Sequence, residues 1–395
     1  MPWKTKGNRE QRWNFIEEFL RNQNSVSGLC RRHGISRKTG YKWIGRFKRG
    51  GRFGLGDRQR VAQRVHNRPS AGWLKRVRRW RARHPSWGAR KLRWALQRRF
   101  GSQGLPSATA ISRWLKRWHL TRRSRRATHK GPVVKRWPLT RAQQPNEVWT
   151  VDFKGWFRTG DGHRLEPLTV RDLASRYVLG VVLLPRQTIE LCRPAFERIF
   201  REHGLPLVIR TDNGSPFGAL GALGLTRLSA WWVKLGIRVE FTAPGHPEQN
   251  GAHEQLHRVY AEETLNPPAH TVRAQKRRSE NWRRQYNAGR PHEALAMRVP
   301  AELYGKSQRW LPGRLKPWKY AAGWASRLVR SKGQISLQGR SRFVGEAFER
   351  ERVGLKWGRP GVWEVYFGPL LIGELWDRDS TPGIRAAWYR AGRKR

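Results

Sequence analysis

Three carboxylates occupy positions where a purely structural role does not explain the residue type. Asp152 lies inside the apolar run Val148–Phe153, where a buried strand ordinarily carries Val or Ile. Asp212 directly follows a second apolar run, 207–211, and Glu254 comes near the start of a helical stretch. A carboxylate without a partner is costly to bury, so Asp152 requires a metal ion, a basic group or hydrogen-bond donors.

Each of these acids also has an ordinary explanation when it is taken alone. Asp152 can pair with an arginine, Asp212 can belong to the turn that follows it, and Glu254 can complement a helix dipole. Two acids on neighbouring strands and one on a following helix can nevertheless meet at one point. Carboxylate oxygens without histidine or cysteine partners are ligands that Mg²⁺ prefers. In a basic chain with few acids, the pattern predicts two-metal phosphoryl transfer.

The elements that must position these acids begin at Val148, where the sequence changes to apolar and β-branched runs bounded by Gly and Pro. Strands that alternate with helices predict a mixed sheet covered by helices, an α/β layer domain. We expect strands at 148–153, 165–170, 177–184, 207–211 and 239–241, and helices at 188–203, 228–235 and 252–264.

The charge of the chain indicates a polyanionic partner. The 395 residues include 82 Lys and Arg against 28 Asp and Glu, a net charge of +54. The first 146 residues carry 40 of these bases and only 4 of the acids. Such a segment repels itself unless it works against a polyanion, most commonly nucleic acid. Charge alone leaves bulk RNA and anionic lipid open.

Composition excludes several other classes. The longest strongly apolar stretch, 177–184, is too short to span a membrane, and no apolar signal segment follows Met1. Cys30 and Cys192 lie far apart without a metal-binding or disulfide spacing. We therefore expect no membrane association and a reducing, cytoplasmic location.

Residues 1–56 predict a helix-turn-helix module for DNA. Apolar residues recur at helical spacing in three short runs, Gly34 supplies the turn after the second, and Ser36 is a natural N-cap for the third. The third helix of such a module enters the major groove. We expect four side chains to project from it toward DNA: Arg37, Lys38, Thr39 and Lys42.

Residues 57–120 repeat the pattern as a second helical DNA-binding module, whose last helix opens at Pro106-Ser107 and carries Arg113 and Lys116. Residues 121–146 read as a basic linker that can follow a phosphate backbone. Its DNA-contact candidates are Arg122, Arg123, Arg125 and Arg126. For both modules the alternative is an ordinary helical bundle with a solvated basic face.

Four segments carry a resemblance to a known family: 149–152 (WTVD), 210–217 (RTDNGSPF), 247–258 (PEQNGAHEQLHR) and 286–295 (YNAGRPHEAL). Together they resemble the ordered motifs of DDE transposases of bacterial insertion sequences, which have a retroviral-integrase-type catalytic core. The resemblance implies an RNase H-like core over 147–305. It also implies that Asp152, Asp212 and Glu254 form a catalytic triad that binds two Mg²⁺ ions, with Mn²⁺ able to substitute.

The motifs supply supporting residues and show two departures. The supporting candidates are Asn213, Asn250, Gly251, His257 and Arg258. Between the two aspartates lie 59 residues, which is ordinary for the family, whereas the 41 residues between Asp212 and Glu254 are more than usual. The glycine-rich segment 218–224 accounts for the surplus as a loop insertion. No His/Cys zinc module stands at the amino terminus, which favours an insertion sequence over a retroelement.

Four other residues compete for roles near the triad. We interpret Asp172 as a structural partner of Ser175 and Arg176, and Glu248 as a weaker candidate for the third ligand. His253, like His257 and Arg258, is a candidate contact to the scissile phosphate or a plain surface residue. His292 is likewise a candidate contact to the scissile phosphate or a plain surface residue.

Residues 306–395 return to short strands separated by Gly and Pro, which predicts a small C-terminal β-barrel. The barrel resembles in position the carboxy-terminal barrel of integrase-type proteins. Its basic strands suggest DNA contact, and a purely stabilising barrel is the alternative.

The sequence as a whole predicts a transposase that binds the terminal repeats of its mobile element, cleaves DNA by Mg-dependent hydrolysis and joins the 3′ ends to target DNA. Its partners are then double-stranded DNA, as element ends and as target, and further copies of itself in a dimer or tetramer on DNA. Two alternatives stay open. One is a catalytically inactive DNA-binding repressor, and the other is an RNase H-type nuclease.

Overall fold

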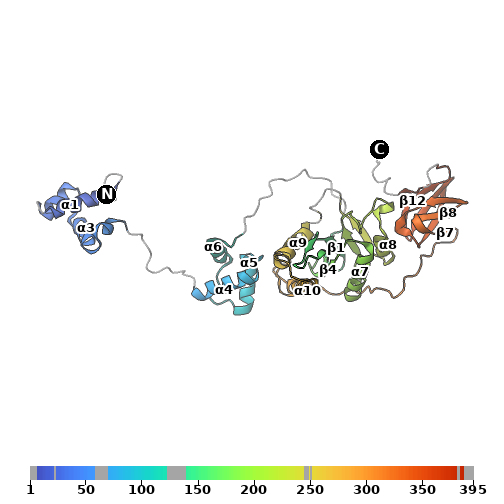
Figure 1. Ribbon diagram of the computed structural model, residues 1–395, viewed down its shortest axis with the longest axis horizontal. Coiled ribbons are helices and arrows are strands. Elements are labelled where there is room, and N and C mark those ends of the chain that lie inside the picture. The colour runs from blue at the N-terminus through green and yellow to red at the C-terminus, as the bar shows by residue number, and fades with distance from the viewer. Residues whose placement is uncertain are drawn as a thin grey trace. The chain divides into compact units, whose positions relative to one another are not determined.

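The computed structural model describes residues 7–21, 24–57, 70–121, 139–243, 249, 251–379 and 383–386 (Figure 1). The chain divides into two compact units, Met1–Pro69 and Ser70–Arg395. Each unit has its own hydrophobic core and is described by itself.

The first unit is a three-helix module followed by a short 3₁₀ turn. Its elements are α1 (Asn8–Leu20), α2 (Val26–Arg32), α3 (Arg37–Gly50) and η1 (Gly51–Leu55). Ser36 caps α3 as expected, because its hydroxyl accepts from the Thr39 N–H at 3.2 Å. Gly34 takes a φ of 62° in the turn between α2 and α3, which glycine adopts without strain. The predicted helix-turn-helix geometry is thus confirmed.

Two contacts fix α3 within this unit. The buried guanidinium of Arg12 on α1 lies 4.0 Å from the ring centroid of Trp43 on α3 and donates to the Leu55 carbonyl at 2.9 Å. Gly40 lets α3 approach α2 closely, since a Cβ at this position would lie 2.4 Å from Cys30 Sγ. The helix that carries the predicted DNA contacts is therefore held by packing on both neighbours.

The second unit begins with another three-helix module. Its helices are α4 (Ala71–Arg83), α5 (Ala89–Phe100) and α6 (Ala108–Arg117). Ser70 and Ser107 cap α4 and α6 through their hydroxyls, and α6 begins directly after Pro106-Ser107, as the sequence predicted. The module is closed around a small apolar core formed by Trp73, Val77, Leu92, Leu96, Ile111 and Leu115.

A mixed sheet forms the centre of the second unit. Its strands are β1 (Val148–Phe153), β2 (Phe157–Arg158), β3 (Arg164–Asp172), β4 (Val178–Leu184), β5 (Val208–Thr211) and β6 (Arg238–Phe241). The order is β2-β3-β1-β5-β6, with β4 also paired to β3. The pairs β1–β3 and β3–β4 are antiparallel, whereas β1–β5 and β5–β6 are parallel. The α/β arrangement expected from the sequence is present.

Helices cover both faces of this sheet (Figure 1). On one face, α7 (Ile189–His203) and α8 (Arg227–Lys234) pack against the sheet through a large aromatic core that includes Phe196 and Trp232. On the other face lie α9 (Gly251–Thr264) and α10 (Val272–Gly289), which form a smaller core with β4. The sheet is thereby buried between two helical layers, as an α/β core requires.

Helix α10 was not predicted from the sequence. Three of the side chains that it buries are polar, Gln275, Ser279 and Asn287, so its apolar stripe is weak. These polar groups are satisfied locally. The Ser279 hydroxyl lies 2.7 Å from the Tyr260 hydroxyl on α9. The Asn287 amide accepts from the Val178 N–H at 2.8 Å and donates to the Val178 carbonyl at 2.9 Å.

The C-terminal region forms an open sheet and a separate hairpin. The sheet has the order β13-β12-β11-β10-β7, and the hairpin pairs β8 with β9. The strands are β7 (Ala325–Leu328), β8 (Gln334–Leu337), β9 (Arg340–Phe343), β10 (Arg352–Arg359), β11 (Val362–Phe367), β12 (Leu370–Trp376) and β13 (Arg385–Ala386).

The closed barrel that the sequence suggested is not confirmed within the described strands. Only a single bridge, Phe343 to Gly383, links the hairpin to the segment that leads into β13. Between β7 and β8 the Arg327 guanidinium donates to the Ser336 carbonyl at 3.1 Å, with no strand ladder assigned there. Hydrogen bonding of the backbone therefore does not run continuously around the strands, although their inward side chains share one core.

This C-terminal region packs directly on the α/β core. Ala230 and Val233 of α8 belong to the same apolar cluster as Phe348 and Phe367. The Lys234 ammonium lies 2.7 Å from a carboxylate oxygen of Glu351. Among the helices of the described ranges, none is long and apolar enough to cross a membrane.

Candidate active site

The carboxyl ends of β1 and β5 bring two of the predicted acids to one edge of the sheet. The strands run parallel, with Val148 opposite Val208 and Thr150 opposite Arg210. Continued by two residues, this register sets Asp152 opposite Asp212. Side chains at paired positions of neighbouring parallel strands point to the same face, so the two carboxylates are directed to a common region.

Asp152 is held by its backbone and is partly screened from solvent. Its position pairs with Thr169 on β3, and the Thr169 hydroxyl donates to the Asp152 carbonyl at 3.0 Å. The Asp152 side chain keeps 19% of its surface exposed. Its Oδ2 atom lies 3.9 Å from Nδ1 of His257, on the helix α9 that crosses this face.

Asp212 lies in the turn after β5 and is exposed. Its Oδ1 atom accepts from the Gly214 N–H at 3.3 Å, so the carboxylate also stabilises the turn. The neighbouring Asn213 donates its amide N–H to the carbonyl of Thr242, which follows β6. Asn213, predicted as a supporting residue, thus ties the ends of β5 and β6 together and fixes the turn that carries Asp212.

Two histidines of α9 converge on Thr169 behind Asp152. Nε2 of His253 and Nε2 of His257 both lie 2.8 Å from the Thr169 hydroxyl oxygen. A hydroxyl has a single proton, and here it is given to the Asp152 carbonyl. Both imidazoles must then donate from Nε2, which leaves Nδ1 of His257 as an acceptor that faces the carboxylate.

Burial keeps both imidazoles neutral. Desolvation lowers the pKa of His257 to about 3, with the nearby Lys154 as a second cause. Burial also lowers the pKa of the fully buried His253 well below its usual value, assisted by His257 and Arg171. These side chains are therefore not surface residues, which corrects one alternative left open by the sequence.

Glu254 is the third acid that the sequence predicted for the metal site. It lies in the first turn of α9, where its side chain is exposed, while its neighbours His253 and His257 turn toward the sheet. Among the residues that the structure describes, no three acidic, imidazole or thiol side chains are grouped closely enough to hold a metal ion. Asp152 and Asp212 supply hard oxygen donors that suit Mg²⁺, and Glu254 stays a prediction as the third ligand.

The remaining motif residues differ in how exposed they are, and two of them are not described by the structure. Gly251 is the first residue of α9, and Arg258 is exposed on the same helix. Asn250 and Glu248 lie outside the described residues. His292 is buried beside Tyr286, with 5.1 Å between the ring centroids, so a contact to a phosphate in this arrangement is disfavoured.

Asp172 has the structural role that the sequence predicted for its pairing with Ser175. This fully buried carboxylate accepts from the Ser175 N–H at 2.7 Å and from the Ser175 hydroxyl at 2.5 Å. It also accepts from the Asn146 N–H at 2.7 Å. Burial raises the pKa of Asp172, and these hydrogen bonds oppose the rise. The residue closes the turn after β3 rather than facing the two aspartates.

The predicted DNA-contact residues within the described ranges lie at the surface of their modules. Arg37, Lys38 and Lys42 are exposed on α3, whereas Thr39 is half-buried with its hydroxyl 2.9 Å from that of Ser36. Arg113 and Lys116 are exposed on α6. The four linker arginines, Arg122, Arg123, Arg125 and Arg126, lie outside the described residues.

Thr169 is the site residue that sequence reasoning missed. A threonine inside a β-branched strand looks ordinary, because threonine is common in strands. The available signal was its register, since a residue directly opposite Asp152 on an antiparallel strand can bond the backbone of that acid.

Comparison with known proteins finds related domains along most of the chain. Residues 142–247 match the integrase core domain family, and residues 235–300 match a second integrase core domain family. Residues 11–62 match a helix-turn-helix domain family, and residues 325–381 match the C-terminal domain of the IS481 family transposases.

Two insertion-element proteins are similar in sequence. An uncharacterized 31.7 kDa protein of element IS407 from Burkholderia multivorans is 30% identical over 183 residues, which is 46% of this chain and 64% of that protein. An uncharacterized 39.2 kDa protein of element IS476 from Xanthomonas euvesicatoria is 29% identical over 180 residues, which is 45% of this chain and 50% of that protein. The chain thus spans less than two thirds of the length of either relative.

Among solved structures, the HTLV-2 integrase catalytic core domain in complex with magnesium aligns with 42% of this chain and 100% of its own, at 18% identity and a TM-score of 0.31. The simian T-cell lymphotropic virus intasome aligns with 73% of this chain and 91% of its own, at 14% identity and a TM-score of 0.36. By its sequence, the chain contains regions that match the helix-turn-helix, integrase core and IS481 family transposase C-terminal domain families, and it is similar to proteins of two bacterial insertion elements.

Proposed function

We propose that the protein is a transposase that binds the terminal repeats of its own mobile element, cleaves the DNA there by Mg-dependent hydrolysis and joins the 3′ ends to target DNA. The observation that carries the proposal is the parallel pairing of β1 with β5 inside an integrase core domain, which directs Asp152 and Asp212 to one edge of the sheet.

The proposal divides the chain by task. Residues 1–56 and 57–120 bind the element ends, the linker 121–146 follows the DNA backbone, residues 147–305 carry the chemistry, and residues 306–395 contact DNA with their basic strands. The exposed lysine and arginine side chains on α3 and α6 suit this division. Contacts to phosphates supply affinity, and a few side chains recognise the edges of nucleobases.

Asp152 and Asp212 would hold the metal ions, and Glu254 would complete the ligand set. Bound Mg²⁺ polarises a phosphoryl oxygen and activates a water or hydroxyl nucleophile. The protein's own contribution is positioning. The bond from Thr169 to the Asp152 carbonyl fixes the strand, and the neutral edge of His257 beside the carboxylate limits how that carboxylate can turn. Exposed Arg258, one turn after Glu254, is available to a DNA phosphate.

Two element ends have to be brought together before joining, so we propose that copies of the protein assemble as a dimer or tetramer on DNA. An inactive DNA-binding repressor remains the main competitor, because it would share the helix-turn-helix surface without cleavage. An RNase H-type nuclease is the second competitor, and cleavage of the RNA strand in an RNA–DNA hybrid would reveal it.

The proposal is tested with DNA that bears the two flanks of the gene. The full chain is assayed for nicking and strand joining with Mg²⁺ or with a chelator, beside the variants Asp212→Asn and Asp161→Asn. Asp161 is an exposed acid in the turn between β2 and β3 and serves as the charge-matched control. Mg-dependent nicking and joining that disappears only in Asp212→Asn is expected. Tight binding without cutting would favour the repressor.

A further inference from the structure

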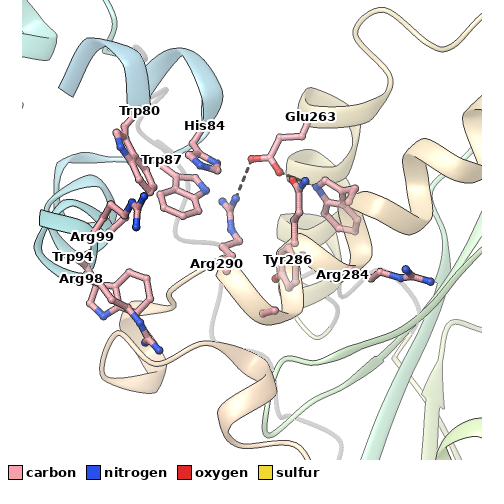
Figure 2. Close-up of a pocket in the computed structure, with 15 residues that line it drawn as sticks. Trp80, His84, Trp87, Trp94, Arg98, Arg99, Glu263, Arg284, Tyr286 and Arg290 are labelled. Atoms are coloured by element: carbon pink, nitrogen blue, oxygen red, sulfur yellow. Dashed lines mark hydrogen bonds and ion pairs between the residues drawn. The ribbon is translucent and has the colours of Figure 1, made fainter. Parts of the chain in front are cut away.

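A cavity of about 630 Å³ lies between the second helical module and the α/β core, within the second unit (Figure 2). Helices α4 and α5 and the loop that joins them form one wall, and the end of α10 forms the other. The residues that define it are Trp80, His84, Trp87 and Trp94 on the first wall and Tyr286 and Gly289 on the second. Its size is within the usual range for sites that bind small organic groups.

Aromatic ring faces dominate the wall formed by the helical module. The rings of His84 and Trp87 are stacked, with 4.0 Å between centroids and an interplanar angle of 19°. Trp80 continues the row at 5.6 Å from His84. Trp94 lies on α5, on the same side of the cavity (Figure 2). Trp87 is buried in the core of the module, so the half-buried rings of Trp80, His84 and Trp94 offer the surface on which another flat ring can stack.

Arginines give the cavity a positive character. Arg98 and Arg99 are exposed on α5 and line it. The Arg98 guanidinium lies 5.3 Å from the Trp94 ring centroid and 3.1 Å from a carboxylate oxygen of Glu302, so its charge is compensated and Arg99 is the main candidate to contact an anion. Glu263 is the acidic residue among the lining residues, and its negative charge is compensated by partners within the protein. Its carboxylate accepts from Arg290 at 3.0 Å and from the indole N–H of Trp282 at 2.8 Å. The cavity therefore complements an anionic group that carries an aromatic ring.

The wall on the core side leaves room for such a ring. Gly289 stands at the end of α10, and a Cβ built at this position meets no atom within 4 Å. Gly289 and the neighbouring Ala288 both line the cavity and are exposed, so the space beside Gly289 is open.

We propose that this cavity receives one unpaired nucleobase of the bound DNA, with the base against the rings of Trp80, His84 and Trp94 and its phosphate beside Arg99. The proposal rests on the proposed function, since it takes DNA as the ligand. Bases of every type stack on aromatic side chains, and arginine is suited to phosphate. A paired base inside a duplex presents only its edges, so the site selects a base that has left the stack. An apolar contact that merely joins the two modules is the alternative outcome.

The test uses the full chain and three labelled duplexes of one sequence. The first is fully paired, the second has one unpaired thymidine bulge, and the third has the same bulge without its base. Binding is followed by fluorescence anisotropy at fixed salt, because salt changes the phosphate contribution. We expect the thymidine bulge to bind at least about 5-fold more tightly than the abasic bulge, the lower limit for one stacked base.

Two variants test whether the preference for the thymidine bulge arises in this cavity. Trp94→Leu removes an aromatic face, and Gly289→Leu adds a side chain where a Cβ meets no atom within 4 Å. Both should bind the two bulges equally, while their affinity for the paired duplex stays that of the unaltered chain. Trp114→Leu is the matched control, since Trp114 is a half-buried tryptophan of α6 in the same module that does not line the cavity. It should retain the preference.

Each outcome bears on one proposal. Equal affinity of the unaltered chain for the two bulges overturns the nucleobase site and leaves the transposase proposal standing. A preference that survives in both Trp94→Leu and Gly289→Leu overturns it as well, because the base must then bind elsewhere. Absence of binding to every duplex overturns the DNA-binding function itself. If Trp94→Leu loses paired-duplex affinity through misfolding, Gly289→Leu decides.

Discussion

Nδ1 of His257 lies 3.9 Å from Oδ2 of Asp152, while Nε2 of the same imidazole lies 2.8 Å from the Thr169 hydroxyl. Thr169 in turn donates to the backbone carbonyl of Asp152. These contacts form one small buried network, which lies against both the backbone carbonyl and the carboxylate of Asp152. The network links β1, β3 and α9.

Replacing Thr169 tests this network. Thr169→Val keeps the shape of the side chain but leaves two buried imidazole N–H groups without their acceptor. We expect the free energy of unfolding to fall by about 1–3 kcal/mol, and DNA nicking to fall because Asp152 is less well positioned. Urea unfolding and the nicking assay measure the two effects. Thr169→Ser keeps the hydroxyl and should restore both, and an unchanged Val variant would refute the positioning role.

The stability of the fold should depend on pH through His203. This buried histidine at the end of α7 has its pKa lowered to about 4, chiefly by burial. Its pKa in the unfolded chain is about 6.5, so its contribution is fully present above that pH and is lost as the pH falls toward 4. The expected loss is on the order of 2 kcal/mol. Urea unfolding between pH 8 and pH 4 measures it.

Variants separate His203 from the other histidines in that experiment. His203→Phe should reduce the acid loss by the share of His203, since the ring is retained beside Tyr177 and Tyr304 without a titrating group. The rest of the loss persists, because burial also lowers the pKa of His257 and of His253. The exposed His163, changed to Gln, should leave the dependence as it is. An acid loss in His203→Phe as large as that of the unaltered chain would show that His203 does not contribute.

The close approach of α3 to α2 predicts opposite effects for two glycines of the same helix. A Cβ at Gly40 would meet Cys30 Sγ at 2.4 Å, so Gly40→Ala should destabilise the first unit by about 1–3 kcal/mol. Gly45 faces only the far end of Arg49 at 3.8 Å, and Gly45→Ala should stabilise it by about 0.5–1 kcal/mol. Thermal unfolding followed by circular dichroism compares the two, and equal effects would contradict the packing.

Lys42 should contribute to DNA affinity through a phosphate or base contact. Lys42→Gln is expected to weaken binding to an element end. If the contact is to phosphate, the slope of log K against log salt should fall by about 0.9. Arg21→Gln, at the exposed end of α1, is the control for loss of one positive charge. Equal weakening by the two changes would show that only net charge matters.

Sequence patterns predicted most of the elements because apolar periodicity reports burial. The run Val148–Phe153 is a strand with the expected bounds, and Ser36 and Ser107 cap helices as their position indicated. Helix α10 was not predicted, because polar side chains such as Gln275 lie on its buried face. Their hydrogen-bond partners on other elements cannot be identified from the sequence.

The candidate site was predicted in part for a similar reason. The motif places Asp152 and Asp212 on strands, and the register of β1 with β5 follows from the fold. The burial of His253 and His257 depends on how α9 crosses the sheet, which spacing along one helix does not determine. The closed barrel is not confirmed, because the sequence pattern of a strand predicts the strand itself but not whether the last strand pairs with the first.

The amide of Asn287 has a consequence for assembly. Strand β4 pairs with β3 alone, so its other edge presents backbone groups that a strand of another copy could join. By accepting from the Val178 N–H and donating to its carbonyl, the Asn287 side chain satisfies both groups as a neighbouring strand would. At Val178 the edge of the sheet is thereby protected against pairing with a strand of another copy.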